Sequence, residues 1–184
     1  LQGKAVLNLE EAQLKKNIAT TRSFETNYTE WEQLKERVST FAVSCAEKLR
    51  KQNSCCGSLM VFIHTNFHRK DLPPYSRNIV VKLPYPTNSS IELTKFAIQA
   101  LKQIFKEGFA YKKAGVIVQD FTPAENIQQT LFESRNTKHI PLMNAVDKIN
   151  LAFGQQKVRL ASQDVKRIWK MKQEKLSPRY TTCL

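Results

Sequence analysis

The chain has 184 residues, with 29 Lys and Arg against 16 Asp and Glu, which gives a formal net charge of +13. This length allows one ordinary domain and a smaller unit, and a charge of this sign favours polyanionic partners such as nucleic acid or an acidic protein. The four cysteines, two of them adjacent, exclude a disulfide framework, and the sequence contains no apolar run long enough for a membrane span. We therefore expect a soluble, cytoplasmic protein.

The first predicted elements are a linker, a strand and a helix. Residues 1–14 are mixed in character and indicate a linker, and residues 17–23 are β-branched enough for a strand. Thr29 and Glu32 fit a capping box. A long amphipathic helix follows, because apolar residues recur there at three-to-four spacing: Trp31, Leu34, Val38, Phe41, Cys45 and Leu49.

Two further strands are predicted after this helix. Gly57 opens the first, in which apolar and other side chains alternate: Leu59, Val61 and Ile63 against Ser58, Met60, Phe62 and His64. Residues 79–83 form the second, which we expect to end at Pro84 and Pro86 because proline cannot donate to a sheet.

Ser89 and Glu92 fit a second capping box, ahead of a helix that Gly108 ends. Residues 114–119 then form a fourth strand. The order over residues 17–119 is β-α-β-β-α-β, which predicts an α+β fold: a four-stranded antiparallel sheet with two helices on one face. The other face is left open for a partner.

The pattern changes after residue 120. Residues 121–140 lack periodicity and indicate a flexible linker. Pro141 is expected to start a short helix that Gly154 ends, with four apolar residues on one side: Leu142, Met143, Val146 and Ile149. Residues 157–161 are a candidate strand and residues 163–173 a basic helix, so the tail is expected to be a small α/β unit.

The sequence offers little support for a catalytic or metal-binding site. Clustered carboxylates hold divalent ions in polymerases and nucleases, but the aspartates here are isolated, and the five glycines form no phosphate-binding loop. His64 and His68 are a candidate metal pair, yet one belongs to a strand and the other to a loop, with no CxxC motif nearby. We expect no catalytic residue and no cofactor in this chain.

A stand-alone RNA-binding α/β module is an alternative with the same order of elements. Such modules stack bases on aromatic residues of their central strands. Phe62 is the aromatic residue that could face outward here.

Specific residues favour another class of protein. Thr21-Arg22-Ser23-Phe24 closely resembles the Ser-Arg-Ser-Phe that opens the little-finger domain of UmuC-like Y-family DNA polymerases, the ImpB/MucB/SamB family. Residues 111–116, Tyr-Lys-Lys-Ala-Gly-Val, resemble the last strand of that domain. The C-terminal region peculiar to this family is similar to three segments of the tail: Leu142-Met143, 147–150 and 176–182.

The resemblance implies a division into four parts. Residues 1–14 would be the linker from catalytic domains absent from this chain, and 15–120 the little-finger, DNA-binding domain. Residues 121–140 would be a flexible linker, and 141–184 the UmuC-type C-terminal region. The chain would then be a non-catalytic portion of an error-prone, Mg²⁺-dependent lesion-bypass polymerase of the bacterial SOS response. Its implied partners are template-primer DNA, a UmuD′-like dimer and RecA-coated DNA, and its implied place is the nucleoid.

A little finger is implied to grip DNA mainly through phosphates, which holds register without reading sequence. We expect Arg22, with Thr21 and Ser23, to make such contacts from the open sheet face. Lys82 alternates with apolar neighbours and should project from the same face. The further candidates are Lys112, Lys113, Arg69 and Lys70. Glu25 stands where the family often has glycine.

The segment Gln128-Gln129-Thr130-Leu131-Phe132 resembles the pentapeptide by which bacterial polymerases dock on the β sliding clamp. Leu131 and Phe132 would enter an apolar pocket while Gln128 forms a hydrogen bond at its rim, and a few such anchors carry most of an interface. Gln129 replaces the commoner leucine. The sequence thus predicts a clamp-docking peptide in the linker.

Overall fold

The computed structural model describes residues 15–69, 71–125, 136–154 and 157–163. Along the chain, its elements are β1 (Ile18–Tyr28), α1 (Trp31–Lys51), β2 (Ser54–Thr65), β3 (Ser76–Thr87), α2 (Ser90–Ile104), β4 (Tyr111–Pro123) and α3 (His139–Phe153). The predicted β-α-β-β-α-β order and the α+β fold are confirmed.

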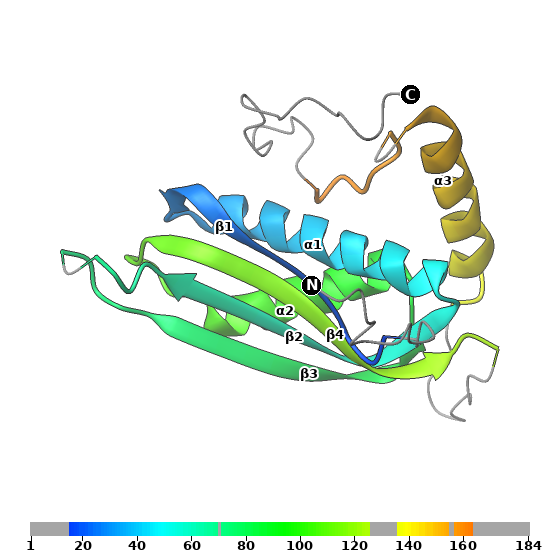
Figure 1. The fold of residues 1–184 in the computed structure, drawn as a ribbon, viewed down its shortest axis with the longest axis horizontal. Helices are drawn as coiled ribbons and strands as arrows, with labels where there is room; N and C mark the ends of the chain where they lie inside the picture. Colours follow the sequence, from blue (N-terminus) through cyan, green and yellow to red (C-terminus); the bar gives the residue numbers. More distant parts are fainter. Residues whose placement is uncertain (1–14, 70, 126–135, 155–156, 164–184) are drawn as a thin grey trace, which may run out of the picture.

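The four strands form one sheet in the order β1-β4-β2-β3, and every neighbouring pair is antiparallel. Helix α1 packs on β1 and β4, and α2 packs on β2 and β3, so both helices lie on the same face (Figure 1). The opposite face is covered by no element that the structure describes. Helix α3 lies beyond the C-terminal end of α1 and runs across it (Figure 1).

The core lies between the sheet and the two helices. Strand β2 contributes Leu59, Val61 and Ile63, all fully buried, which confirms the predicted alternation. Helix α1 contributes the predicted apolar stripe, of which Leu34, Val38, Phe41, Cys45 and Leu49 are buried. Burial raises the pKa of the Cys45 and Cys56 thiols, so both stay protonated core residues. No described helix has the length and apolar character needed to cross a membrane.

The strands are longer than predicted. Strand β3 continues through Pro84 and Pro86 to Thr87, because it is an edge strand whose outer side needs no N–H donor. Its register with β2 also shifts between Cys56 and Ser58, opposite the prolines. Strand β4 extends to Pro123, three residues into the expected linker.

Neither capping box forms as predicted in the described chain. Glu30 is the N-cap of α1, and Glu32 forms an ion pair with Lys35 at 2.9 Å. Ser89 is the N-cap of α2, but its hydroxyl lies 3.1 Å from Nδ1 of His139. Glu92 instead accepts hydrogen bonds from hydroxyl groups of β3. Other side-chain contacts, some local and one distant in sequence, have replaced the two capping boxes.

The tail also differs from its prediction. Helix α3 begins at His139, with Pro141 inside its first turn, where proline is tolerated. Met143 is its one buried residue among those described, whereas Leu142 and Ile149, expected on the same packed side, are 46% and 40% exposed.

The expected strand at 157–161 is absent from the described chain, and residues 157–163 form bends and a turn. The carboxamide of Asn150 holds this segment: Nδ2 donates to the carbonyl of Val158 at 3.1 Å, and Oδ1 accepts from the Val158 N–H at 2.8 Å. The basic helix expected at 163–173 lies outside the described residues, apart from Gln163.

We predict that Gly115→Ala destabilises the fold. A Cβ at Gly115 would lie 2.6 Å from the Phe62 ring and 2.6 Å from Cγ2 of Thr21. Overpacking of this kind costs about 1–3 kcal/mol, measurable by urea denaturation. The loss should shrink when Gly115→Ala is introduced into a Phe62→Ala, Thr21→Ser background. An equal loss of unfolding free energy in both backgrounds would show that crowding against Phe62 and Thr21 is not the cause.

Candidate nucleic-acid interface

The sheet register decides which side chains occupy the open face, because paired residues of neighbouring strands point to the same side. Leu59 and Val61 face the helices, so the residues between them face outward. Two rows cross the open face from β1 to β3: Thr21, Gly115, Phe62 and Asn78, and next to it Ser23, Lys113, His64 and Ser76.

We expected Thr21, Arg22 and Ser23 to contact phosphate together from the open face, but this register places them on different sides of the sheet. Thr21 and Ser23 lie on the open face, whereas Arg22 pairs with Ala114, a fully buried core residue, and so belongs to the helix side. Arg22 is nevertheless exposed, since β1 is an edge strand. Its guanidinium therefore leaves the domain at the sheet edge and not from the open face.

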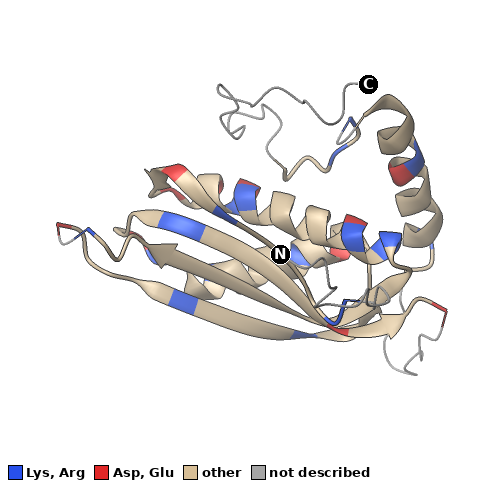
Figure 2. Cartoon of the chain, in the orientation of Figure 1, with Lys and Arg blue, Asp and Glu red and all other residues tan. Residues whose placement is uncertain are grey.

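Lys82 and Lys113 are the lysines that strand pairing places on the open face in the described part of the chain. Lys82 pairs with Ser58 and is exposed, as its alternation predicts, and Lys113 pairs with His64. Lys112 is the extra residue of a bulge and donates to the carbonyl of Glu25 at 2.9 Å. The open face is thus less basic than expected, and Figure 2 shows the basic residues spread over strands and helices.

Arg69 lies in the turn after β2 and forms an ion pair with the carboxylate of Asp71. This pair lowers the pKa of Asp71 and raises that of Arg69. A carboxylate therefore compensates the charge that was expected to meet phosphate. Lys70 lies outside the described residues, as do the clamp-docking candidates Gln128, Leu131 and Phe132.

His64 has a polar neighbour and a charged one. Its Nδ1 lies 2.5 Å from the Ser76 hydroxyl oxygen, and Lys113 is its partner on β4. Partial burial, and then the Lys113 charge, lower the pKa of His64. The imidazole is accordingly neutral at physiological pH. Among the described residues, no three His, Cys, Asp or Glu side chains lie close enough together to hold a metal ion.

An ion pair that the sequence did not indicate fastens α3 to the domain. Nε and Nη2 of Arg50, on α1, donate to the two carboxylate oxygens of Asp147 at 2.6 and 2.8 Å. Nη1 donates to the Asn88 carbonyl at 2.7 Å and to the Ser90 hydroxyl at 3.1 Å. The Arg50 side chain is only 9% exposed. Because 97 residues separate the two charges, no local pattern could have revealed the pair.

A second polar contact lies at the start of α3. Nδ1 of His139 lies 3.2 Å from a carboxylate oxygen of Glu92, a buried residue of α2. The same carboxylate accepts hydrogen bonds from the hydroxyls of Tyr85, at 3.0 Å, and Thr87. Both polar contacts hold α3 near the N-terminal end of α2.

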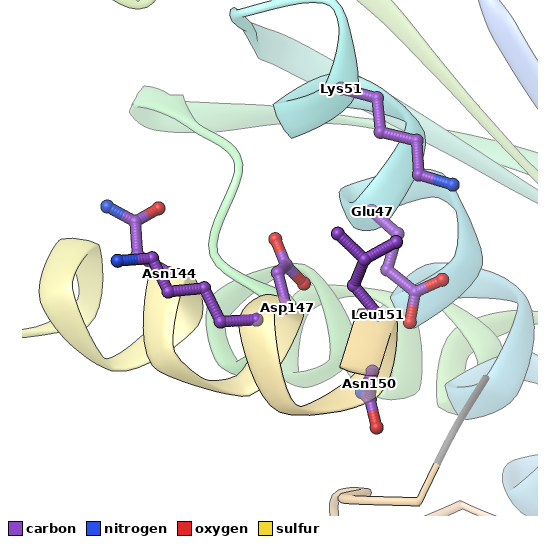
Figure 3. A pocket seen from close by; sticks show the side chains of 7 residues that line it. Glu47, Lys51, Asn144, Asp147, Asn150 and Leu151 are labelled. Atoms are coloured by element: carbon purple, nitrogen blue, oxygen red, sulfur yellow. The ribbon is translucent and has the colours of Figure 1, made fainter. Parts of the chain in front are cut away.

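Beside the Arg50–Asp147 pair is a pocket of about 420 Å³ between α1 and α3. Figure 3 shows Glu47 and Lys51 of α1 facing Asp147 and Leu151 of α3 across it. Burial, and the repulsion from Asp147, raise the pKa of Glu47 against the opposing effect of nearby basic residues. The pocket therefore combines acidic, basic and apolar groups and favours no single class of ligand.

Residues 15–131 match the C-terminal domain of the impB/mucB/samB family. The chain belongs to this family. Residues 141–184 match a domain of unknown function, DUF4113. The two matches meet in the structure at the Arg50–Asp147 pair, since Arg50 belongs to the family domain and Asp147 to the second match.

Individual relatives support the same membership. The chain is 34% identical to Protein UmuC of Salmonella typhimurium and 36% identical to Protein ImpB of the same organism. It is 34% identical to Protein MucB of Escherichia coli. Each alignment covers 99% of this chain but only 43–44% of the relative. The chain therefore spans less than half the length of these relatives.

We predict that Asp147→Ala loosens α3. The substitution removes both acceptors from two charge-assisted bonds of a buried guanidinium, each worth roughly 1.5–3 kcal/mol. Amide hydrogen exchange along α3 should become about tenfold faster or more. Lys148→Ala, an exposed neighbour on the same helix, is the control. Equal protection of α3 in the two variants would show that the ion pair does not hold the helix.

Proposed function

We propose that the chain is the DNA-gripping and protein-docking portion of an error-prone lesion-bypass DNA polymerase that acts in SOS-type repair. Family membership supports the polymerase context, and the uncovered sheet face is the observation that carries the DNA-binding role. In this proposal the Mg²⁺-dependent active site belongs to the rest of a longer protein in the bacterial cytoplasm. In this proposal the present chain contributes DNA binding and docking on partner proteins.

The open face suits contacts to a phosphate backbone. Lys113 and Lys82 lie about six residues apart along the β2 register, which corresponds to about 20 Å of strand. Thr21 and Ser23 add hydroxyl donors on the β1 side. Phosphate contacts from such groups position a duplex without reading bases. A polymerase that copies past damaged bases must bind DNA without regard to its sequence. Arg22 can add a contact from the sheet edge.

The 184-residue chain should bind primer-template DNA of any sequence, with an affinity that falls as salt rises. The plot of log affinity against log salt has a negative slope, and each lost phosphate contact makes that slope shallower by about 0.9. Lys113→Ala should show this change in fluorescence anisotropy titrations. The control is Lys35→Ala, because Lys35 pairs with Glu32 on α1. The proposal fails if the chain does not bind at low salt, or if the two variants behave alike.

We also propose that the segment containing Gln128, Leu131 and Phe132 docks on the β sliding clamp. Its resemblance to clamp-docking peptides supports the role, and described residues fix the chain on both sides. Before it, the Ala124 N–H donates to the Asn53 carbonyl at 2.9 Å. After it, His139 contacts the Ser89 hydroxyl. The described residues on either side of the segment therefore contact the same domain.

Leu131→Ala and Phe132→Ala should each weaken binding of the chain to the β clamp by about 30-fold, the effect expected of a hot-spot anchor. Thr130→Ala, between the anchors and Gln128, should leave the affinity nearly unchanged. Surface plasmon resonance with immobilised clamp measures this difference. Equal affinity of all three variants and the parent chain would reject the docking role.

Helix α3 supports a second protein contact. It exposes several large apolar side chains, with Leu151 at 88% and Phe153 at 71%. A contiguous apolar patch is typical of an interaction surface, and these exposed side chains are the candidates for one on α3. We propose a UmuD′-like dimer as its partner, with assembly on RecA-coated DNA as the setting, because the resemblance of the tail implies both.

A further inference from the structure

Three rings form a contiguous row at one end of the open face. The centroids of Phe62 and His64 are 5.0 Å apart, and those of His64 and Phe67 are 6.0 Å apart. Phe62, at the inner end of the row, is only 9% exposed. Phe67, in the turn after β2, forms the outer end and is 59% exposed. The inner ring, Phe62, is therefore packed on the sheet, and the outer ring, Phe67, is accessible to a ligand.

A cation accompanies the row. Nζ of Lys113 lies 6.0 Å from the centroid of Phe62, and Lys113 is the direct partner of His64 on β4. Asp71, the acidic residue of the turn after β2, is paired with Arg69. Lys113 is therefore the group beside the row that can attract an anion with an apolar, flat portion.

The middle ring suits contact with a base. The Ser76 hydroxyl engages Nδ1 of His64, so Nε2 is the nitrogen that can reach a ligand. The lowered pKa keeps the imidazole neutral, which lets it pack beside an aromatic ring without the cost of desolvating a charge.

A nucleotide joins a flat base to a phosphate within a few bonds, which suits a row of rings whose middle member, His64, is the strand partner of Lys113. The bases of a duplex are stacked on one another, and only an unpaired base presents its face to a side chain. An apolar protein segment would gain nothing from Lys113. Stacking on aromatic side chains is moreover a general device for holding single strands.

We propose that Phe67, backed by His64 and Phe62, is a stacking site for an unpaired base of single-stranded DNA, and that Lys113 holds the adjacent phosphate. This inference rests on the proposed DNA-binding function and deepens it. The domain then distinguishes the single-stranded template next to a primer from the duplex behind it.

The test compares two ligands bound by the full 184-residue chain: a blunt duplex, and the same duplex with a single-stranded overhang containing 2-aminopurine. Stacking is worth about 1–3 kcal/mol per base, so Phe67→Ala should weaken binding of the overhang ligand by about 5- to 150-fold. It should leave the blunt duplex unaffected. The 2-aminopurine fluorescence, quenched on binding to the parent chain, should stay high with this variant.

Two further variants complete the test. Phe67→Tyr retains the ring and should restore both affinity and quenching. Phe153→Ala removes an exposed phenylalanine of α3 and should change neither. The inference is overturned if Phe67→Ala affects both ligands equally or affects neither. If the parent chain binds neither ligand, the proposed DNA-binding function fails first, and the stacking site fails with it.

Discussion

Strand β4 pairs with β1 on one side and with β2 on the other, and this double pairing determines most of what the domain presents to solvent. Because side chains alternate along a strand, a slip of one residue would exchange the core and the open face. The apolar residues of β2 prevent such a slip. The positions of Thr21, Lys113 and Lys82 are then consequences of core burial and need no stabilising contact of their own.

The same constraint explains the position of Arg22. A Thr-Arg-Ser run places consecutive side chains on opposite sides of a strand, so one sheet face cannot receive all three. In a central strand, the arginine would be buried under the helices. At the edge of the sheet it reaches solvent, and a duplex lying on the open face would meet it only at the margin.

The sequence carried enough information for the main architecture. Alternation in β2 and the three-to-four spacing in α1 predicted the core, because both patterns reflect burial of one side of an element. The prediction for Lys82 rested on the same alternation. Strand ends were less predictable, since the edge position that lets β3 pass through Pro84 and Pro86 depends on the order of strands and not on local residues.

Polar contacts between distant segments were beyond prediction. Ser89 and Glu92 have the correct spacing for a capping box, but His139, Tyr85 and Thr87 compete for their oxygen atoms. Nothing near Arg50 indicates its carboxylate partner. Strand alternation therefore predicted the orientation of Lys82, but the expected open-face position of Arg22 was wrong, and contacts that depend on which loops and helices meet were missed.

The contact between Arg50 and Asp147 also bears on how this protein can be divided. A fragment ending where the family domain ends, at residue 131, would contain the guanidinium without its carboxylate. Arg50 would keep the Asn88 carbonyl and the Ser90 hydroxyl, but its buried charge would be uncompensated. The boundary drawn by sequence families therefore cuts through a polar contact that joins α3 to the sheet-and-helix domain.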